Sequence, residues 1–460
     1  MIDRRNVLKF FSSLPLARVL ISGSAVSAND IVPSASSGWQ NWSGSLSAPS
    51  ALVKTPKSVS ELQDILNTSS ARPVGSGHSW TRLVPGTDTI LKLDHFSGLG
   101  EVNAEEQTAW MGAGTRLVDL SRALEAHDLG FRNIGDINVQ SLAGALSTAT
   151  HGTGKNLPCL AAEVRGVRMV TGAGDVLEVS DQENKHLLPA VQVGLGALGV
   201  LTDVKMQLTG RYKLHRRVWF MPHARVLEEA ERLWAENRNF EFFYIPFSDM
   251  SMCISHNETD APLSAQPVSE DEDAVMQLKM LRDYMSWFPA LRKKLLALAI
   301  KSAPDEEVIG NSWEILSSVR DIKFNEMEYH LAPDRGLEAL EAVRIYIERY
   351  RPDVFFPFEV RQTAGDTAWL SPFNDGPRIS VAVHCYAPDD YAFLFTEIEP
   401  ILRQYGGRPH WGKLNSLGHR DFAELYPQWE AFGALRRQLD PQGRLLNPYL
   451  MNLFENYARV

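Results

Sequence analysis

A short polar stretch near the start of the chain combines backbone freedom with a reactive side chain. Residues 72–80 read "RPVGSGHSW" and set His78 among glycines and serines. Glycines let the backbone approach another group closely, and the N–H groups of such a turn can converge on an anion such as phosphate. The imidazole can hydrogen-bond to a bound group or react with it. Taken alone, however, ordinary turn chemistry explains the stretch better.

Three more glycine clusters follow in the first half of the chain. They read "GAGT" from residue 112, "THGTGK" from residue 150 and "GLGALG" from residue 194. The last one matches the GxGxxG pattern of dinucleotide-binding folds, but its strand, "VLTDVKMQL", comes after it rather than before it. We therefore exclude a nicotinamide-binding Rossmann domain. The pattern at Gly194, Gly196 and Gly199 indicates close backbone packing instead.

The second half of the chain carries ionisable residues at spacings that suit chemistry on a hydroxyl group. "FEVRQT" places Glu359 and Arg361 two residues apart on a predicted strand, so their side chains share one face. "HWGK" places Lys413 beside a turn. Without further context, the first two form a structural ion pair and the lysine is a surface charge. His384, in "VAVHCYA", is either a core histidine or a proton acceptor.

The composition is that of an ordinary globular protein. Of the 460 residues, 44% are hydrophobic and 22% are charged, and the length predicts two or three domains. The formal net charge of −10 argues against a general nucleic-acid-binding or anionic-membrane surface. Cys159, Cys253 and Cys385 lie far apart, which excludes a CxxC motif and a zinc-ligand spacing. We therefore predict no metal site and no disulfide framework.

The N-terminus is typical of an exported protein. Arg4 and Arg5 precede a moderately apolar run, which Arg18 interrupts and makes too polar for a membrane span. "VSA" at residues 26–28 then offers the small residues of a cleavage site. These features predict a twin-arginine signal over residues 1–28, rather than a merely basic tail, and a periplasmic or secreted protein. This route carries folded proteins, which suits a cofactor inserted before export.

Helix and strand patterns alternate in the first half of the chain. Residues 56–67 predict a helix in which Ser58 and Glu61 form a capping box. Residues 115–130 predict an amphipathic helix closed by Gly130. "EVRGVRMVTGAGDVLEVS" predicts a hairpin, and "GVLTDVKMQLTG" predicts a further strand.

Strand patterns dominate after residue 210. "RRVWFM", "FEFFYIPF", "SMCISH", "FNEMEYHLAP", "VFFPFEVRQTA" and "RISVAVHCYA" predict a sheet with helices on one face. Residues 257–275 predict an exposed loop, and residues 275–303 predict a helical segment interrupted near Pro289. The last forty residues return to helix and turn patterns.

Taken in order, these motifs carry a family resemblance. "RPVGSGHS", "GAGTRLVDLSRALEAHDLGF", "SLAGALSTATHGTG" and "GALGVLTDVKMQL" resemble the FAD-binding domain of the vanillyl-alcohol oxidase superfamily. "RPHWGK" and the closing "LDPQGRLLNPYL" are similar to its sugar-1,4-lactone oxidase and alditol oxidase group, over essentially the whole mature chain. The resemblance implies an α+β fold, with a two-subdomain FAD-binding domain and a substrate (cap) domain built on an antiparallel sheet flanked by helices. The expected parts are the signal (1–28), the FAD-binding domain (45–210), the cap domain (211–418) and a C-terminal segment that packs back on the FAD-binding domain (419–460).

The resemblance also implies how FAD is held. The "GSGHS" loop would cradle the pyrophosphate, and His78 would bond covalently to the 8-methyl carbon of the flavin. No cysteine lies in the second glycine loop, so a second covalent attachment is not expected. The other implied cofactor-binding residues are Gly75, Ser76, Gly77, Ser79, Gly135, Ser141, Gly144, Ser147, His151, Gly152, Gly199 and Val200.

The implied reaction is the oxidation of a secondary alcohol. Arg361 and Lys413 would flank the substrate oxygen, with Glu359 orienting them, while hydride passes to flavin N5. The developing negative charge on that oxygen explains the need for two cations. O2 would then reoxidise the flavin and form H2O2, entering beside the small residue Gly135.

Two departures from the alditol oxidase pattern bear on the substrate. Asp136 stands where that pattern has a serine, and His384 where it has a threonine. We therefore expect a sugar lactone such as D-arabinono-1,4-lactone, oxidised at the carbon bearing the 2-hydroxyl. The alternatives are an alditol oxidase of the xylitol or sorbitol type, a lactone dehydrogenase with a periplasmic cytochrome or quinone acceptor, and an exported flavin- or carbohydrate-binding protein. Glu359, Arg361 and Lys413 argue against the last of these.

Overall fold

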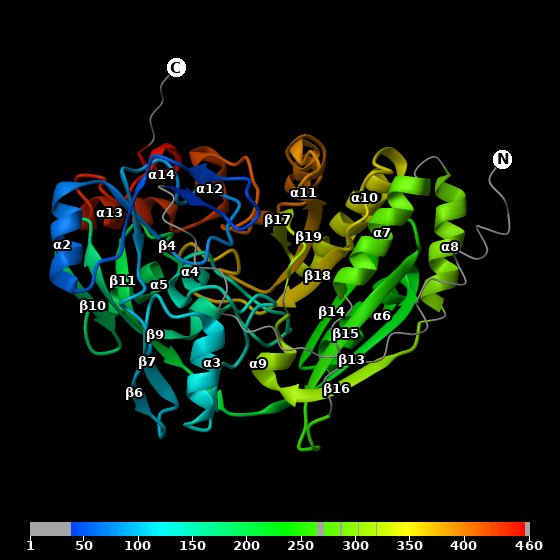
Figure 1. Ribbon diagram of the computed structural model, residues 1–460, viewed down its shortest axis with the longest axis horizontal. Coiled ribbons are helices and arrows are strands. Elements are labelled where there is room, and N and C mark those ends of the chain that lie inside the picture. The colour runs from blue at the N-terminus through cyan, green and yellow to red at the C-terminus, as the bar shows by residue number, and fades with distance from the viewer. Residues whose placement is uncertain (1–37, 265–270, 286–287, 302, 319, 456–460) are drawn as a thin grey trace.

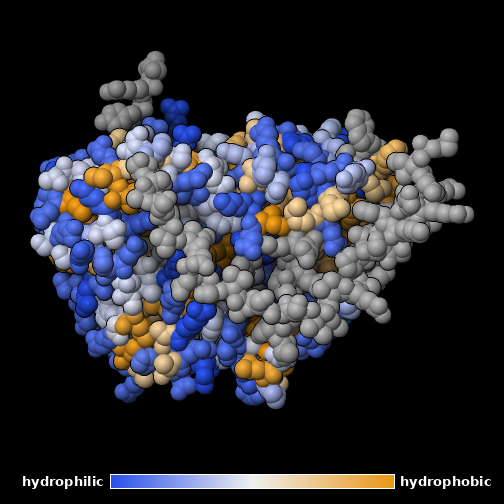
Figure 2. All heavy atoms as spheres, in the orientation of Figure 1, coloured by the Kyte–Doolittle hydropathy of each residue, from blue (hydrophilic) through white to orange (hydrophobic). Residues whose placement is uncertain are grey.

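The computed structural model describes residues 38–455, with gaps at 265–270, 286–287, 302 and 319 (Figure 1). The predicted export signal over residues 1–28 therefore lies outside the described residues. No described helix combines the length and apolar character needed to cross a bilayer. The side of the molecule seen in Figure 2 is largely hydrophilic, and its hydrophobic residues form separate patches.

The chain enters the FAD-binding half through a small parallel sheet. Its strand order is β3-β5-β4, and helix α2 connects β3 to β4. Ser58 caps α2 as predicted, because its hydroxyl accepts from the N–H of Glu61 at 3.2 Å. The Glu61 carboxylate accepts from the N–H of Lys57 instead of Ser58. The bounds are β3 (Leu52–Lys54), α2 (Val59–Thr68), β4 (Ala71–Val74) and β5 (Thr89–Lys92).

A five-stranded antiparallel sheet completes this half. Its order is β10-β9-β11-β7-β6, and the predicted hairpin is confirmed as the β9–β10 pair. The prediction that Gly130 closes the preceding helix is wrong. Helix α3 already ends at Glu125, and Gly130 pairs with Thr209 in a short two-stranded ribbon. The bounds are β6 (Leu99–Asn103), β7 (Thr108–Gly112), α3 (Leu117–Glu125), β8 (Leu129–Gly130), α4 (Leu142–Ser147), β9 (Val164–Thr171), β10 (Val176–Ser180), α5 (Leu188–Val191), β11 (Gly199–Gln207) and β12 (Thr209–Gly210).

The cap half is built on an eight-stranded antiparallel sheet, which confirms the α+β prediction. Its order is β16-β13-β15-β14-β18-β19-β17-β20. Helices α6 and α10 pack on one side, while the opposite side turns toward the FAD-binding half (Figure 1). The strands are β13 (Lys213–Pro222), β14 (Asn239–Ile245), β15 (Met250–Glu258), β16 (Glu306–Asn311), β17 (Phe324–Leu331), β18 (Phe358–Thr363), β19 (Arg378–Tyr386) and β20 (Arg408–Pro409). The helices are α6 (His223–Glu236), α7 (Asp271–Met285), α8 (Pro289–Lys301), α9 (Ser312–Ile315), α10 (Pro333–Tyr350) and α11 (Glu399–Gln404).

The helical segment before β16 follows the predicted pattern with one difference. It divides into α7 and α8 at Pro289, as expected of proline, which begins α8. The predicted exposed loop is shorter than expected, because α7 already begins at Asp271.

The last helices lie against the FAD-binding half. They are α12 (His419–Leu425), α13 (Trp429–Leu439) and α14 (Pro448–Phe454). The N–H of Ala173 donates to the carbonyl of Leu439 at 3.0 Å, and the N–H of Ala71 donates to Arg444 at 2.9 Å. The end of the chain therefore closes the domain that its beginning forms.

Arg72 fixes the strand that leads into the glycine loop. Its buried guanidinium donates to the carbonyls of Leu83, Leu195, Gly196 and Leu445 at 2.6–2.8 Å. Burial lowers the pKa of Arg72 to about 9, although the charge of a nearby aspartate opposes this. Three segments of the chain, around Leu83, Leu195 and Leu445, thus meet on one side chain.

Candidate active site

The glycine loop after β4 packs against the start of helix α4. A Cβ added at Gly75 would lie 2.0 Å from the Oγ of Ser141, so no larger residue fits there. Ser141 caps α4, and the hydroxyl of Ser76 donates to the carbonyl of Val139. Gly75 and Gly144 are both exposed. The loop and α4 therefore line one open surface of backbone groups.

His78 lies at the end of this loop, and one of its ring nitrogens forms no hydrogen bond with the described residues. Its ring stacks on Trp42, with centroids 5.2 Å apart and an interplanar angle of 26°. Its Nδ1 is buried and has no hydrogen-bond partner among the described residues. Burial, and then the charges of Lys413 and Arg116, lower the pKa of His78 to about 4. The imidazole is therefore neutral near pH 7, with a lone pair available for bonding.

The turn that carries Lys413 is bonded directly to the residues that follow His78. The N–H of Trp80 donates to the carbonyl of Gly412 at 2.7 Å, and the hydroxyl of Thr81 donates to the carbonyl of Lys413 at 2.5 Å. The ammonium of Lys413 lies 4.6 Å from the centre of the Trp80 ring. The structure thus brings together two motifs that lie more than 300 residues apart in sequence.

Strand register gathers the other ionisable residues on the sheet face toward the FAD-binding half. Glu359 and Arg361 both point from β18 to this face, as their spacing predicted. On β17 and β19, Glu326 lies directly opposite His384, and Glu328 lies opposite Ala382, which also pairs with Glu359. Directly paired residues point to the same face.

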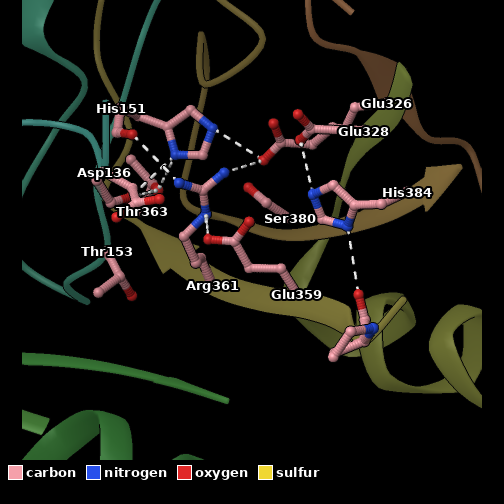
Figure 3. A network of polar contacts seen from close by, with 12 residues as sticks. Asp136, His151, Thr153, Glu326, Glu328, Glu359, Arg361, Thr363, Ser380 and His384 are labelled. Atoms are coloured by element: carbon pink, nitrogen blue, oxygen red, sulfur yellow. Dashed lines mark hydrogen bonds and ion pairs between the residues drawn. The ribbon is translucent and has the colours of Figure 1, made fainter. Parts of the chain in front are cut away.

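Arg361 is the centre of this group (Figure 3). Its guanidinium lies 2.7 Å from Oε1 of Glu328 and 3.2 Å from Oε1 of Glu359. A third contact runs to the carbonyl of His151 at 3.5 Å. Its side chain is only 8% exposed, so these contacts hold it at a fixed place at the edge of the site.

The face carries more acidic than basic groups. The four carboxyls of Glu241, Glu326, Glu328 and Glu359 surround the two cations of Arg361 and Lys413. Burial, together with the neighbouring carboxylates, raises the pKa of Glu359 to about 8 despite Arg361. Burial also raises the pKa of Glu241 to about 7. Glu359 is therefore largely protonated at neutral pH and can donate a hydrogen bond.

His384 presents an unprotonated nitrogen to the same space. Its Nδ1 lies 3.3 Å from the carbonyl of Pro357, an acceptor, so the ring proton lies on Nδ1. Its Nε2 lies 3.7 Å from Oε1 of Glu326, whose other oxygen accepts from Lys413. Burial lowers the pKa of His384, although Glu326 opposes this. A neutral His384 with a free Nε2 lone pair is a suitable proton acceptor.

Three buried histidines lie behind Arg361. The ring centroids of His151, His330 and His410 are 5.0, 5.7 and 5.8 Å apart. Burial is the first cause that lowers the pKa of each one. His151 also lies 3.1 Å from Oε1 of Glu328. His151 therefore contacts the same carboxyl oxygen as Arg361, and the other two rings pack beside His151.

Both halves of the chain match known protein families. Residues 204–453 match the D-arabinono-1,4-lactone oxidase family, and residues 49–180 match an FAD-binding domain. The chain belongs to the D-arabinono-1,4-lactone oxidase family. It is therefore an FAD-dependent oxidoreductase, and the predicted family resemblance is confirmed.

Named relatives cover nearly the whole chain. L-gulono-1,4-lactone dehydrogenase of Mycobacterium tuberculosis is 32% identical, over 89% of this chain and 97% of its own length. L-gulonolactone oxidase of Scyliorhinus torazame is 27% identical, and alditol oxidase of a Streptomyces species is 28% identical, each over 90% of this chain and 98% of its own length. Cholesterol oxidase of Brevibacterium sterolicum shares the fold, with a TM-score of 0.74 at 18% identity over 91% of this chain and 96% of the other.

The residues of this family member fit an FAD molecule in the cradle. The exposed Gly75 of the loop and Gly144 of α4 leave backbone groups open, and a side chain at Gly75 would fill the space that Ser141 occupies. The unpartnered Nδ1 of His78 supplies a nucleophile at the end of the loop. Bound FAD would supply the hydride acceptor for alcohol oxidation. The family's cofactor therefore agrees with the residues present.

The remaining predicted cofactor residues fall in different surroundings. His151 and Gly152 lie beside Arg361, and Ser147 ends α4. Gly199 and Val200 lie buried in β11, where a Cβ at Gly199 would lie 2.8 Å from the Sδ of Met169. Their direct contact with FAD stays a prediction, and packing is sufficient to explain them.

Gly135 and Asp136 join the site to the cap domain. A Cβ at Gly135 would lie 3.1 Å from the carbonyl of His151, so the space for a side chain there is tight. Asp136 forms an ion pair with Arg320 at 2.8 Å and accepts from the hydroxyl of Ser318 at 2.7 Å. Burial would raise the pKa of Asp136, but these two contacts hold it below its usual range.

Several residues of the site were missed by the sequence analysis. They are Glu241, Glu326, Glu328, His330, Ser380 and His410. A signal did exist in "FNEMEYHL", where Glu326, Glu328 and His330 occupy alternate positions of a predicted strand and so share one face. Charged residues are almost never fully buried without partners, so this strand indicated a polar site on its inner face.

Proposed function

We propose that this enzyme oxidises a sugar 1,4-lactone, such as D-arabinono-1,4-lactone, at the carbon that bears the 2-hydroxyl. One observation carries the proposal: the turn that holds Lys413 is bonded to the loop of His78, opposite the sheet face of Arg361 and His384. The substrate oxygen, the two cations and the cofactor cradle then share one space. The names of these relatives support lactones and alditols as the two substrate classes.

The polar groups favour a lactone over an open polyol. A lactone adds a carbonyl oxygen, which only accepts hydrogen bonds. Arg361, Lys413 and protonated Glu359 are donors that suit such an oxygen. Asp136, at the position of a serine in the alditol oxidase pattern, is already engaged by Arg320.

The residues divide the work of the reaction between charge and proton transfer. Arg361 and Lys413 stabilise negative charge that grows on the substrate oxygen. The free Nε2 of His384 accepts the hydroxyl proton, and Glu326 lies 3.7 Å away to stabilise the resulting imidazolium. Glu359 orients Arg361 through their 3.2 Å contact.

An anaerobic substrate panel tests the proposal. Purified holoenzyme is mixed with 1,4-lactones, with xylitol and sorbitol, and with the corresponding free acids, and the flavin absorbance band is followed. We expect rapid bleaching by a lactone and slow or no bleaching by the polyols. Preferential bleaching by polyols would replace the lactone with an alditol, and no bleaching by any sugar would indicate a binding protein.

We propose O2 as the electron acceptor, with H2O2 as the product. The second candidate is a protein or quinone acceptor, because the relative at 32% identity is named a dehydrogenase. Admitting oxygen to the bleached enzyme separates them. Recovery of the flavin band within seconds, with stoichiometric H2O2, supports an oxidase. Recovery only after addition of a cytochrome or quinone analogue supports a dehydrogenase.

We also propose that the enzyme is exported in folded form with FAD bound. The Arg4-Arg5 pair ahead of a weakly apolar run supports this. Arg4→Lys combined with Arg5→Lys should trap the precursor in the cytoplasm. An unchanged periplasmic yield of the double variant would contradict the twin-arginine route. Any membrane association of the mature enzyme would appear as pelleting with membranes in the same fractionation.

A further inference from the structure

The carboxyl of Glu328 is surrounded by nitrogen atoms and is almost fully buried. Its side chain is 1% exposed, its Oε1 accepts from Arg361 at 2.7 Å, and Nε2 of His151 lies 3.1 Å from the same oxygen. A ligand nitrogen of His410 lies within 4.8 Å of both Glu328 and His151. The spacing alone is compatible with a metal site, so the positions of the ring protons decide what this cluster is.

His410 cannot present a lone pair from Nε2. The N–H of Gly412 donates to its Nδ1 at 2.9 Å, so Nδ1 carries the lone pair. A neutral imidazole has one N–H, which must then lie on Nε2. A metal at Nε2 would move that proton to Nδ1, directly against the N–H of Gly412. His410 is therefore a donor in this cluster.

His151 is constrained in the same way by Glu328. Arg361 and His151 together hold the pKa of Glu328 well below its usual range, although burial opposes them, so the carboxyl is ionised. The Nε2 that faces it at 3.1 Å must therefore carry a proton. On the other side of the ring, Nδ1 lies 2.9 Å from the carbonyl oxygen of Gly152, which is also an acceptor. Both ring nitrogens therefore face acceptors, and these contacts favour a proton on each of them, although burial and the charge of Arg361 lower the pKa of His151.

We propose that Glu328 is a positioning residue that aims Arg361 at the substrate oxygen, and that the Nε2–H of His151 holds Glu328 in place. This inference rests on the proposed function of Arg361. Oε1 of Glu328 contacts both donors, so a displacement of the His151 ring would also displace the guanidinium of Arg361. Glu359 supplies the other anchor of Arg361 and faces the substrate, whereas Glu328 acts from behind.

The charge on Glu328 is essential to this role. Glu328→Gln keeps an oxygen acceptor but removes the charge that pairs with Arg361 and with the Nε2–H of His151. Residues that orient a functional group from behind typically change activity by about 10–100-fold. We expect kcat for flavin reduction to fall by about that factor, with KM changed by less than about threefold, because the substrate is not touched directly.

The chain offers a matched control elsewhere in the cap domain. Glu341 also accepts from a histidine and an arginine on one oxygen, with His223 at 2.9 Å and Arg344 at 2.7 Å. Its side chain is 30% exposed and lies on helix α10, away from the site face. Glu341→Gln should leave kcat and KM unchanged.

The protonation of the two ring nitrogens of His151 is measured directly by nitrogen-15 NMR on selectively histidine-labelled holoenzyme. The His151→Gln variant is used to assign the signals. We expect His151 to carry a proton on Nε2 in the wild type, and to change its protonation state or titrate at a different pH in Glu328→Gln but not in Glu341→Gln. This measurement needs no substrate, so it stays informative if the lactone proposal fails.

Three results would overturn the inference. The first is a wild-type His151 with its only proton on Nδ1. The second is a folded, FAD-loaded Glu328→Gln enzyme whose kcat matches the wild type. The third is one bound transition metal per chain that is lost in Glu328→Gln. If Glu328→Gln does not fold, His151→Gln provides the kinetic test, because it should lower kcat with little change in KM.

Discussion

The side-chain hydroxyl of Thr81 donates to the backbone carbonyl of Lys413 at 2.5 Å. This contact joins the loop that would hold FAD to the turn that carries Lys413, the proposed substrate-binding lysine. A second bond, from Trp80 to Gly412, runs beside it. The position of the Lys413 ammonium relative to His78 is therefore set by backbone contacts, which suits a group that must stabilise charge at a fixed point.

Removing the Lys413 ammonium should slow the chemical step more than it weakens substrate binding. Loss of one donor to a developing oxyanion typically costs about 10²–10³ in kcat. We expect Lys413→Ala to slow anaerobic flavin reduction by that factor, measured by stopped-flow absorbance, with a far smaller change in substrate Kd. Lys293→Ala, which removes an exposed lysine paired with Asp249, is the control. An unchanged reductive rate in Lys413→Ala would move the substrate pocket elsewhere.

The proton on Glu359 should make the stability of the protein depend on pH. The folded protein keeps this proton up to a pH near 8, whereas the ordinary pKa of the group is 4.5. Folding therefore binds a proton between these values, and the contribution of Glu359 to stability falls as pH rises through this window. Glu359→Gln removes this pH-dependent contribution to stability. The Tm of the variant minus the Tm of the wild type should therefore rise between pH 5 and pH 8.

Glu341→Gln provides the opposite case for the same thermal measurement. The pKa of Glu341 is lowered to about 2, chiefly by its contacts with His223 and Arg344 against burial, so this carboxyl stays ionised in both states above pH 5. Its difference in Tm from the wild type should stay flat. A flat difference for Glu359→Gln as well would show that Glu359 is ionised in the folded protein.

Covalent attachment of FAD should depend on His78. Its neutral ring and unpartnered Nδ1 suit attack on the flavin methyl group. The wild-type protein should stay yellow after acid precipitation, whereas His78→Ala should release flavin into the supernatant. His95→Ala, which changes an exposed histidine of the same domain, should retain it. Release of flavin from the wild type under the same conditions would rule out the bond.

A methyl group at Gly135 should destabilise the protein as well as slow reoxidation. The added Cβ would lie 3.1 Å from both the carbonyl of His151 and the Cγ2 of Thr150, and overpacking of this kind costs about 1–3 kcal/mol. Gly130→Ala is the matched control, because a Cβ there meets nothing within 4 Å. A lowered Tm with an unchanged rate of reoxidation by O2 would show that packing alone requires this glycine.

Local structural features could be predicted from the sequence where a short-range pattern determines the structure. Ser58 begins α2 because its hydroxyl reaches an N–H three residues on, and Pro289 separates two helices because proline lacks an N–H. The prediction that Gly130 ends the helix was wrong, although a glycine after an amphipathic pattern usually does so. In this structure Asp128, two residues earlier, takes the left-handed conformation at φ 54°.

The supporting half of the site could not be predicted because it depends on strand order. Glu359 and Arg361 lie on one strand, so their relation is local. Glu328 reaches Arg361 only because β17 and β18 both pair with β19, which no short motif encodes. The tautomer of His410 depends on one backbone N–H two residues away in a folded turn.

The four carbonyls that receive Arg72 also set an order of events during synthesis. One of them belongs to Leu445, 373 residues after Arg72, and the strand of Arg72 leads straight into the loop of His78. A nascent chain that has not yet extended past Leu445 lacks this contact, so the contacts of Arg72 cannot be complete before that segment is made. We therefore expect FAD loading to follow the synthesis of this segment, and truncation after Asp440 should abolish it.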